Sequence, residues 1–342
     1  MKMIKQMACA ALAAACVAGI SGCGSSSDYS KPKVAEGAIA ATVVRPVEDT
    51  SIAQLCKQYG LGLSDLMKKV PDEDFQEVAK ELELEKAKHK WIAFSFSDVS
   101  VEKIEKGEPD FAMAIATTVD LDKVIAVVEK KLKDGKRDEE IKKTTVADVP
   151  AYEFVKNKKP DGFAANLDKQ LILFANTQAG LEKQIALYRD GKGASADFGS
   201  FALGANDILR TKAMKVGENV KKNLPSPDAL QMVNNFVPDG DKIVLGMGAV
   251  ELALGAVGKD VKLDLAVETA ADADADKLVT LAKTGLMPLT AQMQKAADKD
   301  ADAKLAYEAL QGVKVEAKGK VASLSAVAPA EPILKLISEK IK

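Results

Sequence analysis

The side chains that most often carry out chemistry are scarce in this sequence. The 342-residue chain contains one histidine, His89, and four cysteines. So few imidazoles and thiols argue against a His/Cys metal cage and against a Ser-His-Asp or Cys-His nucleophile. His89 stands among Lys86, Lys88 and Lys90, in a run that is typical of the basic end of a helix. We therefore expect His89 to be a solvated surface residue with no catalytic role.

Three carboxylates alternate at Asp272, Asp274 and Asp276, as they do at the start of a calcium-binding loop. An EF-hand loop also requires glycine at its sixth position and glutamate at its twelfth. Here those positions hold Lys277 and Lys283. The aspartates are better explained as the first turn of a helix, whose macrodipole they stabilise. We expect no metal site.

The motifs that resemble cofactor-binding or catalytic signatures are incomplete. Gly246-Met247-Gly248 opens like a dinucleotide-binding loop, but Glu251 replaces the third glycine and a strand is expected to follow. Pairs of carboxylates for glycoside hydrolysis occur in any chain with 50 acidic residues, and the single tryptophan offers little sugar-binding surface. We predict no enzyme and no cofactor, with a carboxylate-dependent hydrolase as the least favoured alternative.

The overall composition is that of an ordinary globular protein. Hydrophobic residues make up 47% of the chain and charged residues 29%, while 48 basic and 50 acidic side chains leave a net charge of −2. A nearly neutral chain creates no field that attracts nucleic acid, and it has few aromatic residues for base stacking. Nucleic acid is therefore not an expected partner.

The N-terminus has the pattern of a secretory signal. Lys2 and Lys5 precede an uncharged run from Met7 to Ile20, which is shorter than the roughly 20 residues that span a bilayer. The run ends in Ile20-Ser21-Gly22-Cys23, and Gly24-Ser25-Ser26-Ser27 follows it. A Gly/Ser-rich stretch is typical of a flexible tether. The sequence thus predicts a signal peptide over residues 1–22 and a tether over 23–36.

Ile20-Ser21-Gly22-Cys23 resembles the lipobox of bacterial lipoproteins, in which an aliphatic residue and two small residues precede a cysteine. The resemblance implies cleavage before Cys23, with diacylglycerol on its thiol and a membrane as partner through this anchor. Gly24, where an aspartate would retain the protein at the inner membrane, favours the outer membrane, facing the periplasm or the cell surface. Cys56 is then the one free thiol of the mature chain, and its apolar neighbours indicate a structural role.

Two stretches of the chain follow the same plan at an offset of about 150 residues, which predicts an internal repeat. Each consists of a basic segment that ends in proline, a helix, two strands and a second helix. The first stretch comprises residues 67–71, 74–86, 91–97, 111–119 and 121–132, and the second comprises residues 220–225, 228–236, 243–249, 261–269 and 274–282.

Further strands and a helix close each copy. In the first they are expected at residues 151–155, 162–166 and 170–176 with a helix at 178–189, and in the second at 312–318 and 321–327 with a helix at 329–341. We therefore predict an α+β fold with two tandem similar domains, 37–195 and 196–342. Each would be an antiparallel sheet of β-β-α-β-β-α order packed by helices.

The sheet of the first domain is expected to be apolar on both faces. Phe94, Phe96, Ile172 and Phe174 lie on the strands beside an alanine-rich strand. A sheet with two apolar faces needs a second cover. That cover is either the N-terminal helices or the other domain, or else a ligand or a partner. These four residues are the candidate apolar contact face.

Together these patterns predict a lipid-anchored extracytoplasmic protein that is a non-catalytic binding or scaffolding module for a protein partner. The alternative is a periplasmic carrier of a hydrophobic ligand, such as a lipid or a lipoprotein. In a carrier, the sheet and helices of one copy would enclose a cavity.

Overall fold

The computed structural model describes residues 31–45, 51–59, 80–82, 87, 89–98, 110–134, 139–198, 201, 203–204, 206–223, 231–235 and 238–341. Its contacts divide the chain into two compact units, the first ending at Gly204 and the second beginning at Ala205, apart from a short segment within residues 100–107. The expected signal segment, Cys23 and the expected tether up to residue 30 lie outside the described residues. So do the expected element at 67–71, most of 74–86 and part of 228–236. The chain has an α+β fold, with helices and antiparallel sheet in both units.

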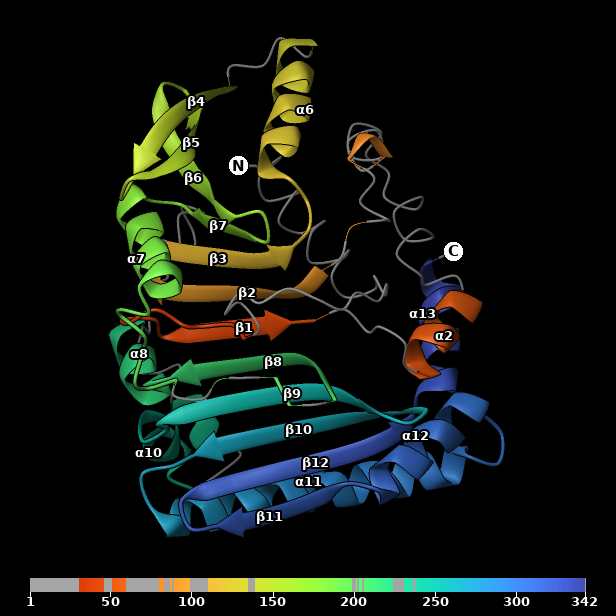
Figure 1. Cartoon of the computed structure of the whole chain (residues 1–342). Coiled ribbons are helices and arrows are strands. Elements are labelled where there is room, and N and C mark those ends of the chain that lie inside the picture. Colours follow the sequence, from red (N-terminus) through yellow and green to blue (C-terminus); the bar gives the residue numbers. More distant parts are fainter. Residues whose placement is uncertain are drawn as a thin grey trace. The chain divides into compact units, whose positions relative to one another are not determined.

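The first unit is an antiparallel sheet with helices on it (Figure 1). Its strands lie in the order β1-β2-β3-β7-β6-β5-β4. The elements are β1 (Ala40–Val44), α2 (Ser51–Gln58), β2 (His89–Asp98), β3 (Asp110–Thr117), α6 (Leu121–Asp134), β4 (Glu139–Val146), β5 (Val149–Lys156), β6 (Lys159–Asp168), β7 (Leu171–Ala175) and α7 (Gln178–Arg189).

Side chains of strand β3 contribute to both faces of this sheet. Because side chains alternate along a strand, Met113 shares a face with its cross-strand partners Phe94 on β2 and Phe174 on β7. The neighbouring Ala114 pairs with Leu173 and points to the other face. Helix α7 contacts β3, β4, β6 and β7, and its side chains Leu181, Ile185 and Leu187 have no exposed surface.

Tight hairpins join β4, β5 and β6. The two-residue loops Ala147-Asp148 and Asn157-Lys158 have positive φ at both positions, as a type I′ turn requires. These turns match the right-handed twist of the strands they join, so they fix the register of both hairpins.

The second unit is a smaller antiparallel sheet with strand order β8-β9-β10-β12-β11. Its elements are β8 (Asp207–Met214), α8 (Val216–Asn223), the 3₁₀ turn η2 (Met232–Asn235), α10 (Gly240–Leu245), β9 (Ala249–Val257), β10 (Asp260–Glu268), α11 (Asp272–Ala296), α12 (Ala301–Gln311), β11 (Lys314–Lys318), β12 (Val321–Pro329) and α13 (Ala330–Ile341). Helix α11 contacts β11, β12 and α12, and Figure 1 shows it running along these strands.

One apolar cluster of the second unit lies between α11 and the sheet. It consists of Ala275, Val279 and Ala322, with Leu278, Val315 and Ala317 partly buried against it. Farther along the sheet, the paired side chains Leu252, Leu265 and Leu324 share one face, yet each stays half-buried. Helix α11 therefore covers only part of the apolar face of this sheet.

Most of the expected elements are present, including α6, α7, β3, β10 and α13. The expected strand over residues 243–249 is wrong, because Gly240–Leu245 is helix α10 and the strand starts at Ala249. A short apolar run does not distinguish a strand from a buried helix by its period alone. Helix α11 runs on to Ala296, well past the expected end at residue 282.

Candidate functional site

The residues expected to form an apolar contact face lie inside the first unit. Phe94, Ile172 and Phe174 are 8%, 8% and 7% exposed, and Phe96 packs against their cluster as a partly buried side chain. The cover is supplied by the chain itself. Leu121 and Ile125 of α6, together with Ala164 of β6, belong to the same buried cluster. These side chains therefore stabilise the fold and do not present a surface to a partner.

Aromatic rings fill the centre of this cluster. The ring centroid of Phe174 lies 5.8 Å from that of Phe111 and 5.9 Å from that of Phe154. Gly162 leaves room for the Phe174 ring, because a Cβ at that position would lie 2.8 Å from the ring atom Cζ. The cluster is thus a close-packed aromatic core, in which edge and face contacts add to the burial of apolar area.

On the other face of this sheet, α7 contacts the backbone near Lys33. Tyr188 of α7 stacks on Trp91, with ring centroids 6.0 Å apart. Its hydroxyl contacts the backbone of Lys33. The backbone N–H of Glu36 donates to the carbonyl of Gly193 at 2.7 Å. The neighbouring residues Ala35 and Ala194 form an antiparallel β-bridge. We call residues 33–36 and 193–195, joined in this way, the N-terminal clamp.

His89 is not the solvated helix residue that the lysine run predicts. It begins strand β2, and both ring nitrogens are buried without a hydrogen-bond partner among the described residues. Burial lowers its pKa, because the charged imidazolium is the form that desolvation disfavours. His89 is therefore a neutral structural side chain.

Cys56 lies on α2 and is half-buried. Burial raises the pKa of its thiol, so the reactive thiolate is disfavoured. This environment is in keeping with a structural thiol.

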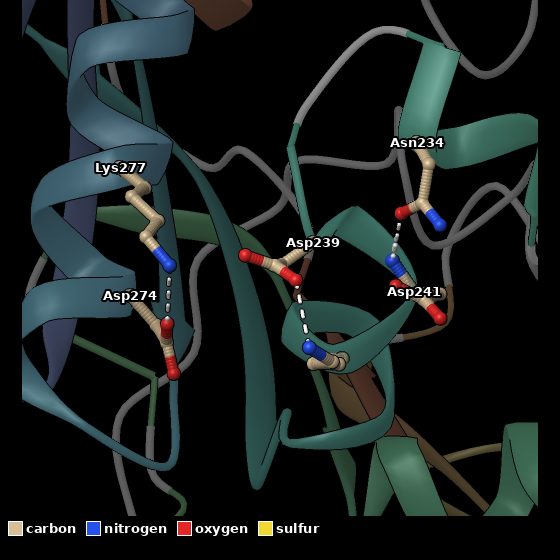
Figure 2. Close-up of polar contacts among 6 residues, drawn as sticks. Asn234, Asp239, Asp241, Asp274 and Lys277 are labelled. Atoms are coloured by element: carbon tan, nitrogen blue, oxygen red, sulfur yellow. Dashed lines mark hydrogen bonds and ion pairs between the residues drawn. The ribbon is translucent and has the colours of Figure 1, made fainter.

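The aspartates at the start of α11 act as helix-terminal charges. Asp272 and Asp274 occupy the first turn of α11, and Asp274 pairs with Lys277 at 3.5 Å (Figure 2). Close by, Asp239 precedes α10 and pairs with Lys242 at 2.8 Å, which holds the pKa of the Asp239 carboxyl below its usual value.

Figure 2 also shows the backbone N–H of Asp241 donating to Asn234 Oδ1, at 2.9 Å. The carboxylates of this region are thus used in pairs with lysines or at helix starts. Among the described residues, no group of three or more His, Cys, Asp or Glu side chains could hold a metal ion.

An open apolar groove of about 440 Å³ lies on the second unit, between α11, the end of α12 and the start of β11. The residues that line it come from these three elements and the loop between α12 and β11: Lys283, Leu286, Met287, Thr290, Ala291, Gln294, Leu310, Val313 and Val315. Met287 is 71% exposed, and the next apolar residue on the helix, Leu289, is 42% exposed. This groove is large enough to hold a small ligand.

Helix α11 places its groove residues in one stripe. Lys283, Leu286, Thr290 and Gln294 recur at three- and four-residue steps, so they lie on one face of the helix. The Thr290 hydroxyl donates to the carbonyl of Leu286 at 2.8 Å, which satisfies it within the helix. Apolar side chains and one lysine therefore dominate the chemistry of the groove.

Sequence reasoning missed this groove because Gly285 and Pro288 lie within α11. Both residues usually end or weaken a helix, and the expected helix stopped before them. The recurrence of Leu286, Leu289 and Met293 at helical spacing was the available signal that the helix continues.

Comparison with known protein families gives no match, and neither does comparison with curated protein sequences. Among solved structures, crystal form IV of TP0453 is similar with a TM-score of 0.42 and 10% sequence identity, covering 90% of this chain and 97% of that one. Crystal form III of TP0453 has the same score and identity, with 96% of that chain covered. No helix of the described residues has the length and apolar character needed to cross a membrane.

Proposed function

We propose that this chain is a lipid-anchored, extracytoplasmic binding protein without catalytic activity, and that its second unit takes up a hydrophobic ligand. The observation that carries the proposal is the open groove between α11, α12 and β11. Its volume of about 440 Å³ lies within the range of roughly 300–1,000 Å³ for small-molecule sites, which are mostly apolar with few polar groups.

The contrast between the two units supports this location. In the first unit the apolar sheet face is closed by α6 and filled with aromatic rings. In the second unit α11 leaves Met287 and Leu289 exposed beside the groove. An apolar surface that stays open to solvent costs free energy unless a ligand or partner covers it, so the open unit is the better binding site.

The similar order of elements supports a tandem arrangement of two related units. The first has strand order β1-β2-β3-β7-β6, and the second has β8-β9-β10-β12-β11. In both, a helix follows the third strand of the sequence and another helix follows the last. The hairpin partners β4 and β5 are the addition that distinguishes the first unit. We propose that the two arose from one plan, with a packed copy and a binding copy.

The anchor at Cys23 belongs to the same proposal. A cysteine that carries two or three acyl chains is held permanently at a bilayer, because each buried methylene contributes about 0.8 kcal/mol. The Gly24 that follows it favours the outer membrane. A binding unit on such an anchor would meet hydrophobic molecules where they leave or enter a membrane.

Binding of a fluorescent apolar probe tests this function. The chain from residue 23 onward, with Cys23 replaced by serine to keep it soluble, should bind the probe with saturation. Leu286→Glu should lose at least about tenfold in affinity, because a charge then stands in the apolar groove. Leu281→Glu is the matched control, since Leu281 is an exposed residue of the same helix outside the groove.

Circular dichroism establishes that both variants fold. Equal losses in the two variants, or no saturable binding by the unsubstituted chain, would overturn the proposal. Palmitate labelling in the bacterial host tests the anchor separately, since a Cys23→Ser chain should lose the label.

A further inference from the structure

We infer that the ligand of the α11 groove is a fatty acid, whose carboxylate pairs with Lys283 while its alkyl chain lies along α11. This inference rests on the proposed function, because it names the class of molecule that the same groove takes up. Three features of the described residues carry it: the shape of the lining stripe, its charge, and its exposure.

The shape suits a single extended chain. The lining residues of α11 run from Lys283 to Gln294, which is about 16 Å along the helix at 1.5 Å per residue. Leu310, Val313 and Val315 form the opposite wall. An apolar strip of this length accommodates one alkyl chain, and Met287 offers a flexible thioether that adapts to its position.

The volume also argues against a protein as the occupant. A stable protein partner covers about 800 Å² on each side, whereas this groove is bounded by nine residues and about 440 Å³. Its size is that of a small-molecule site.

The charge of the lining selects an anion. Lys283 is the one charged side chain among the residues that line the groove, and no carboxylate lines it. Lys283 stands at one end of the stripe and Gln294 at the other. A ligand with a single anionic end therefore matches Lys283, and its apolar remainder matches the apolar side chains between Lys283 and Gln294.

The exposure of Lys283 keeps the desolvation cost of this pairing low. The side chain is exposed to solvent, so neither its ammonium group nor a bound carboxylate must be fully dehydrated. Charge-assisted hydrogen bonds of this kind are stronger than neutral ones. The alkyl chain supplies most of the affinity and the lysine selects the head group.

Calorimetric titration of the Cys23→Ser chain with palmitate, palmityl alcohol and octanoate tests the inference, with each ligand below its micelle concentration. Palmitate should bind about three- to tenfold more tightly than palmityl alcohol, which lacks the charge. Octanoate should bind more weakly than palmitate, since a shorter chain covers less of the stripe.

Lys283→Gln should abolish the preference for palmitate over the alcohol. Lys295→Gln is the matched control, because Lys295 is an exposed lysine of α11 outside the groove. Equal affinity of the unsubstituted chain for acid and alcohol would overturn the fatty-acid assignment while the proposed function stands. Absence of binding by all three ligands would overturn both.

Discussion

The hydroxyl of Tyr188 joins α7 to the backbone of Lys33, which is 155 residues away in the sequence. It accepts a hydrogen bond from the Lys33 N–H at 2.9 Å and donates one to the Lys33 carbonyl at 3.2 Å. Tyr188 is 4% exposed, and burial raises the pKa of its phenol, so the hydroxyl stays protonated as a donor. One buried group thus satisfies both backbone groups of the residue at which the N-terminal clamp begins.

Tyr188→Phe should lower the free energy of unfolding of the first unit by about 1–3 kcal/mol, because it leaves partly buried backbone groups of Lys33 without this partner. Urea unfolding measures this loss. Tyr152→Phe is the matched control: its hydroxyl donates to Asp122 at 2.7 Å at an exposed site, so its removal should cost less than about 0.5 kcal/mol. Equal effects of the two substitutions would contradict the role of the clamp.

Phe174→Ala should destabilise the protein by about 3–5 kcal/mol, since it removes a ring from the middle of the aromatic core. Met287→Ala should change stability by less than about 0.5 kcal/mol, because that side chain is 71% exposed. Thermal and urea unfolding distinguish the two. If both substitutions were harmless, Phe174 would belong to an open surface after all.

Two glycines of the second unit should respond to alanine in opposite directions. Gly217→Ala is expected to cost about 1–3 kcal/mol or more, because a Cβ at this position overlaps the carbonyl oxygen of Leu245, where α8 meets α10. Gly285→Ala is expected to gain about 0.5–1 kcal/mol, since nothing lies near its Cβ position and alanine favours a helix. Chemical unfolding of the two variants tests both signs.

His89 should make the stability depend on pH below neutrality. Its pKa in the folded chain lies below the ordinary value of 6.5, because burial disfavours the charged ring. As the pH falls through 6.5, the unfolded chain binds the proton first, so stability falls until the folded chain is protonated too. Above 6.5 the residue is neutral in both states and contributes no pH dependence.

His89→Leu should remove this part of the acid sensitivity, which urea midpoints between pH 7.5 and 5 would reveal. Other titrating groups stay unchanged in the variant, so the difference between the two pH profiles isolates His89. Superimposable profiles would contradict the burial of its ring.

The elements that could be predicted from the sequence are those whose period is clean. Leu121, Ile125 and Leu132 mark α6 at helical spacing, and Val261 to Val267 mark β10 by alternation. Strand β4 was not predicted, because polar residues occupy most positions on both of its faces and its apolar residues, Ile141 and Val146, do not alternate with them. Strands β1 and β8 also went unpredicted, since neither has a strong alternating pattern over its length.

The groove beside α11 depends on long-range packing, which explains why the sequence predicted a different surface. Phe94 and Phe174 lie on strands that read as apolar on both faces, so they favoured a contact face. Their burial under α6 depends on where that helix docks, which periodicity does not specify. Conversely, Met287 and Leu289 flank Pro288 and look like the end of a helix, although the helix continues through them.

The clamp at Lys33 sets the reach of the whole protein. From Cys23 to Lys33 the backbone can extend to about 35 Å at most, at 3.3–3.6 Å per residue. With Cys23 held in lipid as proposed, Lys33 cannot lie farther than about 35 Å from the anchor. The first unit is then confined to a thin layer next to the bilayer. It then meets other molecules of that membrane by diffusion in two dimensions. The length of chain between Cys23 and Lys33 determines their effective local concentration.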